Sequence, residues 1–415
     1  MTVRNEQDVI VMGGGPAGAT AATLLAQQGH SVTLFERSAG PKFKIGESLL
    51  PGTYWTFERL GILDKLKKSA FPRKYSVQFF SASGRSSEPF YFNQFDPHES
   101  AVSWQVLRSD FDALLRDNAR RCGVDVVEGA RVREVLFEDD RANGVRVDLP
   151  EGSEAECRSR VVVDATGQSA LLSRKLKISK TEAQLRKASV FTHYENGLRG
   201  EGIDEGATLI LQTDDRKGWF WYIALPDNRV SVGVVGDLDD LFADRSMDAK
   251  AIFSRELQKC APVQERLVDA EPVFPVKVTK DFSYRSKHLA GAGWVLVGDA
   301  YGFLDPIYSS GVFLALKSGE MAADAIHEAF EEQDFSAAQL GSFQEEYLAG
   351  MESIRKLVYA FYSPDFNFGK FLRAFPECRQ GVVDILSGNV YRTDVSGIFP
   401  PMATMCALPS EFSVV

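Results

Sequence analysis

A glycine-rich turn near the amino terminus carries the first chemical signal. The apolar run at residues 8–12 leads directly into Gly13-Gly14-Gly15-Pro16-Ala17-Gly18, a G-x-G-x-x-G pattern that opens an Ala- and Leu-rich stretch. In such a turn, Gly13 permits the sharp bend, Gly15 lets the backbone approach a pyrophosphate, and Gly18 lets the helix pack closely on the strand. The pattern predicts a dinucleotide-binding unit, with a helix from residue 16 to about residue 28.

Acidic residues end three strands that we expect in the same sheet. Glu36 closes the run at 31–36, where a carboxylate can bind an adenosine ribose hydroxyl and repel a 2′-phosphate. Asp164 and Asp299 follow Val-rich runs, in Asp164-Ala165-Thr166-Gly167 and Gly298-Asp299-Ala300. Carboxylates there can accept hydrogen bonds from the ribityl hydroxyls of a flavin. The spacing therefore favours FAD, with Asp299 as the ribityl contact.

These turns, in this order, resemble the FAD-dependent monooxygenase superfamily of the para-hydroxybenzoate hydroxylase fold. Gln105-Val106-Leu107-Arg108 is similar to a family segment whose arginine lies against the cofactor phosphates. The resemblance implies an α/β protein with a Rossmann-type FAD-binding domain and an interleaved antiparallel-sheet substrate domain. Asp164-Ala165 replaces the Asp-Gly pair that serves FAD and NADPH in hydroxylases, and the sequence shows no second dinucleotide fingerprint. We therefore expect a separate NADH-dependent flavin reductase to supply reduced FAD.

Two further segments resemble flavin-dependent halogenases. Trp219, Trp221 and Ile223 match the W-x-W-x-I-P motif, with Ala224 in place of the proline. Phe303-Leu304-Asp305-Pro306-Ile307-Tyr308-Ser309-Ser310-Gly311 matches F-x-x-P-x-x-S-x-G in full and opens an amphipathic helix, whose first backbone N–H groups can hold an anion. The resemblance implies a chloride or bromide site formed by Phe303, Ser309, Ser310 and Gly311, with Trp219 and Trp221 on the substrate side.

A lysine completes the resemblance. Lys74 occupies the lysine position of a segment similar to F-x-x-K-x-G, with Ser76 in place of the glycine. The resemblance implies that oxygen and reduced FAD form a flavin hydroperoxide, that halide attacks it, and that Lys74 holds the resulting hypohalous acid. Lys44 is a rival, but its surroundings resemble the flavin-side I-G-E-S loop. The remaining cofactor-binding candidates are Arg37, Lys44, Ile45, Gly46, Glu47, Ser48, Pro306 and Val312.

The residue before the serines of the halide motif distinguishes subclasses. Tryptophan halogenases carry a glutamate there, and this sequence has Tyr308. The resemblance is therefore closer to enzymes that halogenate phenols or pyrroles, either free or bound to a carrier protein, and both remain open. Alternative activities are a flavin hydroxylase, a flavin oxidoreductase similar to geranylgeranyl reductases, and a non-enzymatic flavin carrier or sensor.

Composition narrows the class of protein. The chain has 415 residues, with 47 Lys and Arg against 57 Asp and Glu, and a net charge of −10 disfavours a nucleic-acid partner. Its five widely spaced cysteines and scattered histidines predict neither a disulfide framework nor a metal site, and fit a reducing cytoplasm. Glycines and polar residues interrupt the uncharged stretch at 9–35, so we expect no membrane helix and no targeting segment.

The pattern along the chain predicts interleaved domains. We assign residues 1–75, 100–180 and 275–330 to the FAD-binding domain and residues 76–99 and 181–274 to the substrate-domain sheet. Alternating runs at 75–80 and 230–235 are typical of strands of that sheet. Residues 331–415 are expected to form a C-terminal helical region.

Overall fold

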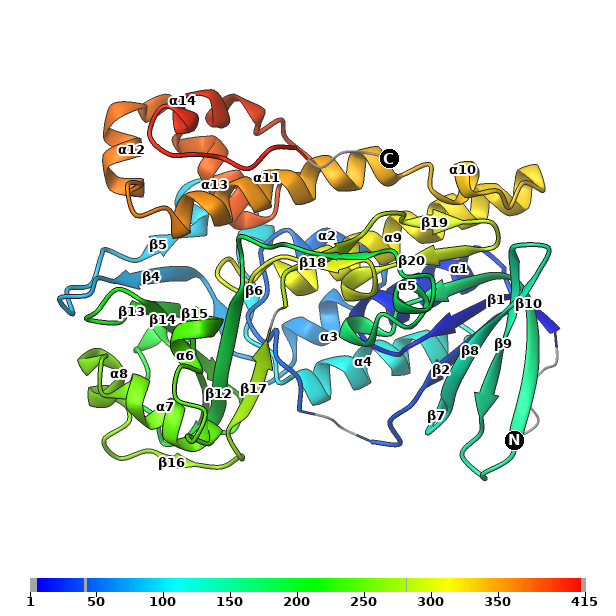
Figure 1. Ribbon diagram of the computed structural model, residues 1–415, viewed down its shortest axis with the longest axis horizontal. Helices are drawn as coiled ribbons and strands as arrows, with labels where there is room; N and C mark the ends of the chain where they lie inside the picture. Colours follow the sequence, from blue (N-terminus) through cyan, green and yellow to red (C-terminus); the bar gives the residue numbers. More distant parts are fainter. Residues whose placement is uncertain (1–5, 41–42, 281, 412–415) are drawn as a thin grey trace.

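The computed structural model describes residues 6–40, 43–280 and 282–411. A mainly parallel sheet flanked by helices forms one part of the molecule, a second, mainly antiparallel sheet forms another, and the C-terminal helices lie along one side (Figure 1). This arrangement confirms the expected α/β fold, with a Rossmann-type half, an antiparallel substrate sheet and a C-terminal helical region.

The first sheet is built on buried apolar strands. Val9, Ile10, Val11 and Met12 have no exposed surface, as is typical of a parallel strand covered on both faces. The order along the sheet is β19 (Ala290–Gly291), β20 (Trp294–Leu296), β10 (Glu154–Asp164), β1 (Glu6–Met12), β2 (Val32–Glu36) and β7 (Asp125–Glu128), with the hairpin of β8 (Arg131–Glu138) and β9 (Arg141–Asp148) paired to β10.

Small residues allow two helices beside this sheet to pack closely against each other. Helix α1 (Pro16–Gln27) packs against α9 (Ser310–Glu332), so closely that a Cβ at Gly319 would lie 2.5 Å from the Ala17 carbonyl oxygen. Helix α4 (Arg108–Arg121) packs on the other side of α1. Because β1 ends where α1 begins, the start of α1 lies at the carboxyl end of β1. This first turn contacts α9 at Gly319, near the middle of α9.

The second sheet presents two different faces. Along β14 (Gly218–Leu225), Trp219, Trp221 and Ile223 point to one side, while Phe220 and Tyr222 pack against α7 (Ala249–Leu257) and its surroundings on the other. The sheet order is β16 (Glu271–Pro272), β12 (Lys187–Glu195), β15 (Arg229–Asp237), β14, β13 (Thr208–Gln212), β4 (Ser76–Phe80) and β5 (Phe90–Tyr91), with β17 (Lys277–Lys280) also paired to β12.

The pairing of β17 bears on the domain division. Residues 277–280 pair with Ala188 to Phe191 of β12 and so lie in the second sheet, although the sequence assigned 275–330 to the FAD-binding part. We retain the rest of the division as a proposal. The remaining short helices and strands are α2 (Thr53–Arg59), α3 (Leu63–Lys67), β3 (Arg73–Lys74), β6 (Ser103–Trp104), α5 (Leu171–Lys175), α6 (Leu238–Leu241), α8 (Ala261–Arg266), β11 (Ser179–Thr181), β18 (Tyr284–Ser286) and β21 (Gly302–Phe303).

The C-terminal region is helical, as the sequence suggested. Its helices are α10 (Ala337–Leu340), α11 (Gln344–Tyr362), α12 (Phe368–Ala374), α13 (Arg379–Ser387) and α14 (Phe399–Ala403). The apolar segment near the end packs inward, with Ile398 and Met402 buried in the main core. Within the described ranges, no helix is both long and apolar enough to span a bilayer.

Candidate functional site

A cavity of ≈ 910 Å³ lies between the carboxyl ends of the first sheet and the Trp-bearing face of the second. Its volume is within the range of pockets that bind cofactors and small ligands, ~300–1,000 Å³. Most of the candidate residues line it: Gly13, Gly15, Pro16, Ala17, Glu36, Arg37, Lys44, Ile45, Gly46, Glu47, Ser48, Arg108, Ala165, Trp219, Trp221, Asp299, Phe303, Pro306, Ser309, Gly311 and Val312. Gly18, Lys74, Asp164 and Ser310 do not line it.

The glycine turn is shaped for close approach of a ligand. Gly13 has φ +107°, and a Cβ there would lie 2.3 Å from the Ala165 carbonyl oxygen. At Gly18 a Cβ would lie 2.0 Å from the Gly13 carbonyl oxygen, so a glycine is needed there for α1 to pack closely on the turn. A Cβ at Gly15 would meet only the Lys44 ammonium, at 3.8 Å, and would project into the cavity. This cradle at the start of α1 fits the pyrophosphate of FAD.

Glu36 stands at the expected strand end but is already hydrogen-bonded. Its Oε2 accepts from the Gly14 N–H at 2.8 Å and its Oε1 from the Ser38 N–H at 2.9 Å. Burial by itself raises the pKa of Glu36, and these backbone donors outweigh that effect, so the pKa lies below its ordinary value. The carboxylate remains ionised and able to accept a ribose hydroxyl.

Charged side chains contact the segment Phe43–Ser48, which we call the cofactor loop, through a hydrogen bond and an ion pair. Arg108 binds Asp112 through Nε at 2.9 Å and donates through NH1 to the Ile45 carbonyl oxygen, while Lys44 Nζ lies 3.1 Å from Asp112. Burial raises the pKa of Asp112, but the two cations outweigh it and hold the pKa below its ordinary value. Arg108 and Lys44 therefore line the cavity as cations balanced by one carboxylate.

The far end of the cofactor loop is attached to the second sheet. Glu47 Oε1 lies 2.5 Å from His193 Nε2, and Ser48 Oγ lies 2.8 Å from Thr208 Oγ1. Gln105 Nε2 donates to the same Thr208 hydroxyl at 2.9 Å. We did not predict from the sequence that His193 or Thr208 lies near the site. The alternation of residue types along their strands was the only sequence feature that indicated their placement.

The two acids that follow Val-rich strands have different surroundings. Asp164 accepts hydrogen bonds from the Thr166 N–H and hydroxyl and from the Leu172 N–H, at 2.7–2.9 Å, and it is fully buried. Its carboxylate is thus occupied by its own turn and does not reach the cavity, contrary to the cofactor contact we expected. Asp299 lines the cavity, and burial raises its pKa to about 6.

The Trp-bearing strand β14 forms one wall. Trp221 Nε1 donates to Ser231 Oγ at 3.0 Å, and Trp219 Nε1 donates to the Tyr362 hydroxyl at 3.0 Å. Ala224 is two residues from Tyr222 and four from Phe220 along β14, so its side chain points to the same face as theirs, away from the cavity. The position where the family has a proline is therefore not part of the cavity wall. An N–H at that position suits the interior of a paired strand.

Residues Phe303–Gly311, which we call the halide loop, lead into α9. Ser309 adopts a left-handed conformation, with φ 57°, immediately before the helix begins at Ser310. Ser310 is buried, whereas Ser309, Gly311 and Phe303 line the cavity. The start of this 23-residue helix therefore faces the cavity, where N–H groups without helical partners and the helix dipole favour an anion.

Asp305, in the middle of the halide loop, is 1% exposed and does not line the cavity. It accepts from the Ile307 N–H at 2.9 Å and from the Tyr362 hydroxyl, at 3.2 Å to Oδ1 and 3.1 Å to Oδ2. Burial raises its pKa to about 7. The halide motif contained Asp305, but no local pattern pointed to Tyr362, which lies 57 residues later.

Lys74 is enclosed beside the cavity. It lies on β3 and is 1% exposed, its Nζ donates to the Leu49 carbonyl oxygen at 3.1 Å, and the ammonium stands 5.4 Å from the centre of the Phe92 ring. Burial lowers the pKa of Lys74 to about 7. The rival Lys44 has 38% side-chain exposure and belongs to the cofactor loop.

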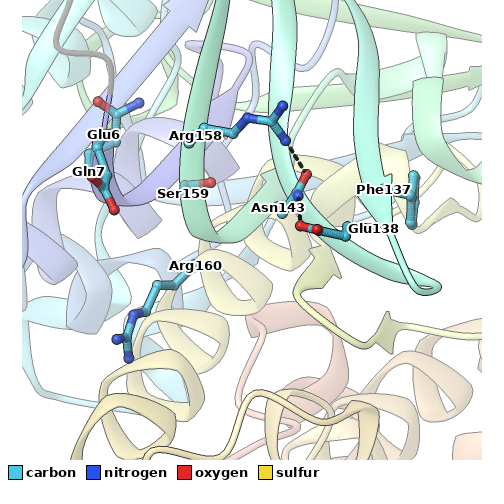
Figure 2. A pocket seen from close by; sticks show the side chains of 8 residues that line it. All are labelled: Glu6, Gln7, Phe137, Glu138, Asn143, Arg158, Ser159 and Arg160. Atoms are coloured by element: carbon cyan, nitrogen blue, oxygen red, sulfur yellow. Dashed lines mark hydrogen bonds between the residues drawn. The ribbon is translucent and has the colours of Figure 1, made fainter.

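A second hollow, of ≈ 560 Å³, lies where β1 begins, at the end of the strand opposite the cavity. Its polar side chains bind one another: Arg158 donates to Asn143 at 2.9 Å, and Asn143 donates to Glu138 at 3.0 Å (Figure 2). Arg160 points away from this group (Figure 2). None of the candidate site residues lines this hollow, and ligands of open α/β sheets bind at the carboxyl ends of the strands.

Comparison with known proteins agrees with this geometry. The tryptophan halogenase family model matches residues 94–368. The chain belongs to the tryptophan halogenase family. A model for FAD-dependent oxidoreductases also matches residues 8–175, which include the glycine turn. This halogenase family member is therefore an FAD-dependent enzyme, and halide and oxygen are the co-substrates typical of its family.

Relatives cover almost the whole chain. A 1H-pyrrole-2-carbonyl-[peptidyl-carrier protein] brominase of Pseudoalteromonas luteoviolacea is 30% identical over 92% of this chain and 91% of its own. The corresponding chlorinase of Pseudomonas fluorescens is 27% identical over 93% and 90%. Among solved structures, the myxobacterial chondrochloren halogenase CndH has a TM-score of 0.81, 30% identity and 97% coverage of both chains.

Proposed function

We propose that this enzyme chlorinates or brominates an electron-rich aromatic ring of the pyrrole or phenol type, presented as an acyl group on a carrier protein or as a free molecule. Two relatives whose names specify a carrier-bound pyrrole align with more than nine-tenths of this chain. Tyr308, where tryptophan halogenases carry a glutamate, supports the same substrate class.

The buried lysine is the observation that carries the proposal. Reduced FAD, when bound, would supply two electrons to O2, so that one oxygen atom leaves as water and the other oxidises halide to hypohalous acid. The N–H groups at the start of α9 hold the halide beside Ser309 and Gly311. Lys74 is buried, and its amine binds the carbonyl of Leu49, the residue after the cavity-lining Ser48. We propose that hypohalous acid passes from the cavity to this amine, away from bulk water.

The pKa of Lys74, about 7, permits two ways of holding the halogen. The ammonium form donates a hydrogen bond to hypohalous acid. The neutral amine forms an N–halogen bond and releases water, and the haloamine then transfers its halogen to a ring carbon while the ring loses a proton. Both forms are populated near pH 7. The Leu49 carbonyl fixes the position of Nζ and therefore the ring position that is attacked.

The proposal extends to partners and compartment. A separate NADH-dependent flavin reductase supplies reduced FAD, because the cavity of this chain carries one dinucleotide cradle. A cytoplasmic location fits the five cysteines, all of them free thiols in the described chain.

The test is halogenation by the purified protein with FAD, NADH, a flavin reductase and bromide or chloride. Pyrrole-2-carbonyl and hydroxybenzoyl groups are offered both on a carrier protein and as free acids, and products are analysed by mass spectrometry. Lys74→Met removes the amine at similar volume, and Lys68→Met is the control because Lys68 is an exposed lysine of the same segment.

We expect a halogen isotope pattern that requires halide, is retained in Lys68→Met and is lost in Lys74→Met. An oxygen-containing product formed without halide would instead identify a flavin hydroxylase. Regioselective halogenation by Lys74→Met would remove the role assigned to this amine.

A further inference from the structure

One hydroxyl group joins the halide loop, the Trp-bearing strand and the C-terminal helix α11. The Tyr362 hydroxyl donates to the Asp305 carboxylate at 3.1 Å and accepts from Trp219 Nε1 at 3.0 Å. A tyrosine hydroxyl has one proton to donate and lone pairs to accept, so both bonds form together. Trp219 lines the cavity, while Tyr362 and Asp305 do not.

A lysine contacts the face of the Tyr362 ring. Lys187 Nζ lies 4.1 Å from the centre of its ring and also binds Asp237 at 2.7 Å. A cation over an aromatic face is attractive, so the ring is held at one face by Lys187 as well as by its hydroxyl. Tyr362 therefore provides a fixed point for the halide loop.

A second bond joins the same helix to the same loop. The Tyr308 hydroxyl donates to the Leu357 carbonyl oxygen of α11 at 3.0 Å. Asp305 and Tyr308 lie on either side of Pro306. Helix α11 is therefore hydrogen-bonded to the halide loop at two positions just before the turn at Ser309. Tyr359, on the same helix, instead donates to Glu182 at 2.8 Å and has no hydrogen bond to the halide loop.

We propose that Tyr362 is a positioning residue for the halide: through Asp305 and Trp219 it sets the conformation of the halide loop and hence the halide affinity. This inference rests on the proposed halide site. The N–H groups at the start of α9 bind an anion well only when they converge on one point, and that convergence depends on the turn at Ser309. FAD binding depends mainly on the glycine turn and the cofactor loop, to which Tyr362 has no hydrogen bond, and only in part on Pro306, Gly311 and Val312. The halide affinity should therefore change much more than the FAD affinity.

The experiment compares Tyr362→Phe with Tyr359→Phe. Each variant loses one hydroxyl from α11, but only the first loses the contact with the halide loop. Three quantities are measured: the apparent KM for bromide in the halogenation assay, the rise in Tm of the FAD-loaded protein with bromide concentration, and the Kd for FAD. The Tm measurement reports bromide binding without turnover.

We expect Tyr362→Phe to raise the KM for bromide roughly tenfold, the equivalent of ~1.4 kcal/mol. The bromide concentration needed for a given rise in Tm should increase by the same factor. The Kd for FAD should stay within twofold, and Tyr359→Phe should match the wild type in both bromide measurements. If Tyr362→Phe folds poorly, Tyr308→Phe breaks the other bond between α11 and the loop and should shift the bromide values in the same direction.

Wild-type bromide values in folded Tyr362→Phe would overturn the inference while leaving the halogenase proposal intact. A wild-type protein that neither halogenates nor gains stability from bromide would overturn both. An equal loss of bromide and FAD affinity in Tyr362→Phe would show general loosening of the fold and would also overturn the positioning role.

Discussion

Glu47 and His193 form a fully buried pair, with 2.5 Å between Oε1 and Nε2, although 146 residues separate them in the chain. Glu47 belongs to the cofactor loop and His193 to β12, so this bond fixes the loop that lines the FAD cavity onto the sheet that forms its opposite wall. The rings of Phe43 and Phe274 lie 4.6 Å and 5.3 Å from His193 and exclude water from the pair.

Replacement of His193 should loosen this connection. His193→Ala leaves a buried carboxylate without its partner, and we expect a loss of about 3–5 kcal/mol in the free energy of unfolding, together with weaker FAD binding. Denaturant titration and FAD fluorescence measure the two effects. His288→Ala, at an exposed histidine, should change neither quantity. Unchanged FAD affinity in a destabilised His193→Ala protein would show that the pair does not control the cofactor loop.

Two glycines of the same turn should respond differently to alanine. Gly15→Ala places its Cβ into open cavity space, so we expect a wild-type Tm without FAD and at least a tenfold higher Kd for FAD, about 1.4 kcal/mol. Gly13→Ala combines φ +107° with a 2.3 Å approach to a carbonyl oxygen and should lower Tm even without FAD. Equal FAD affinity in Gly15→Ala and the wild type would exclude close contact of the cofactor with this turn.

The buried Lys74 should make stability depend on pH above neutrality. Its pKa is about 7 in the folded protein against an ordinary value of 10.5, so between these values the unfolded chain binds more protons here. Stability then rises with pH across that window. Lys74→Met removes this titration, and we expect its Tm to exceed that of the wild type most clearly near pH 6 to 7, with the gap shrinking towards pH 10. A gap that does not vary with pH would contradict the lowered pKa.

The buried Asp305 should make stability decrease as pH rises, in the range below neutrality. Its pKa is raised from 3.8 to about 7, so between these values the folded protein binds more protons, and stability falls as pH rises. Asp305→Asn keeps an acceptor for Tyr362 but cannot ionise. We expect its stability relative to the wild type to increase between pH 4 and pH 7 and then to level off. Parallel stability curves for the two proteins would show that Asp305 is ionised throughout.

The FAD half of the site could be predicted because its signals are local. A glycine turn, the strand before it and Glu36 at the end of the next strand are linked by short chain segments whose geometry admits few arrangements. The halide loop was identified in the same way, from a run of nine residues that ends at the start of a helix. Asp164 shows the limit of such reasoning, since its strand end was recognised but its carboxylate bonds to its own turn.

The sequence by itself determined the Rossmann-type architecture and the class of cofactor, because these follow from backbone requirements of consecutive residues, and its motifs indicated the family by resemblance. Only the tertiary structure decided that Glu47 meets His193, that Tyr362 meets both Asp305 and Trp219, and that Lys74 lies enclosed outside the cavity wall. Such contacts join segments 57 to 146 residues apart. They depend on how two sheets and a C-terminal helix pack together, and no local pattern of residue types specifies that packing.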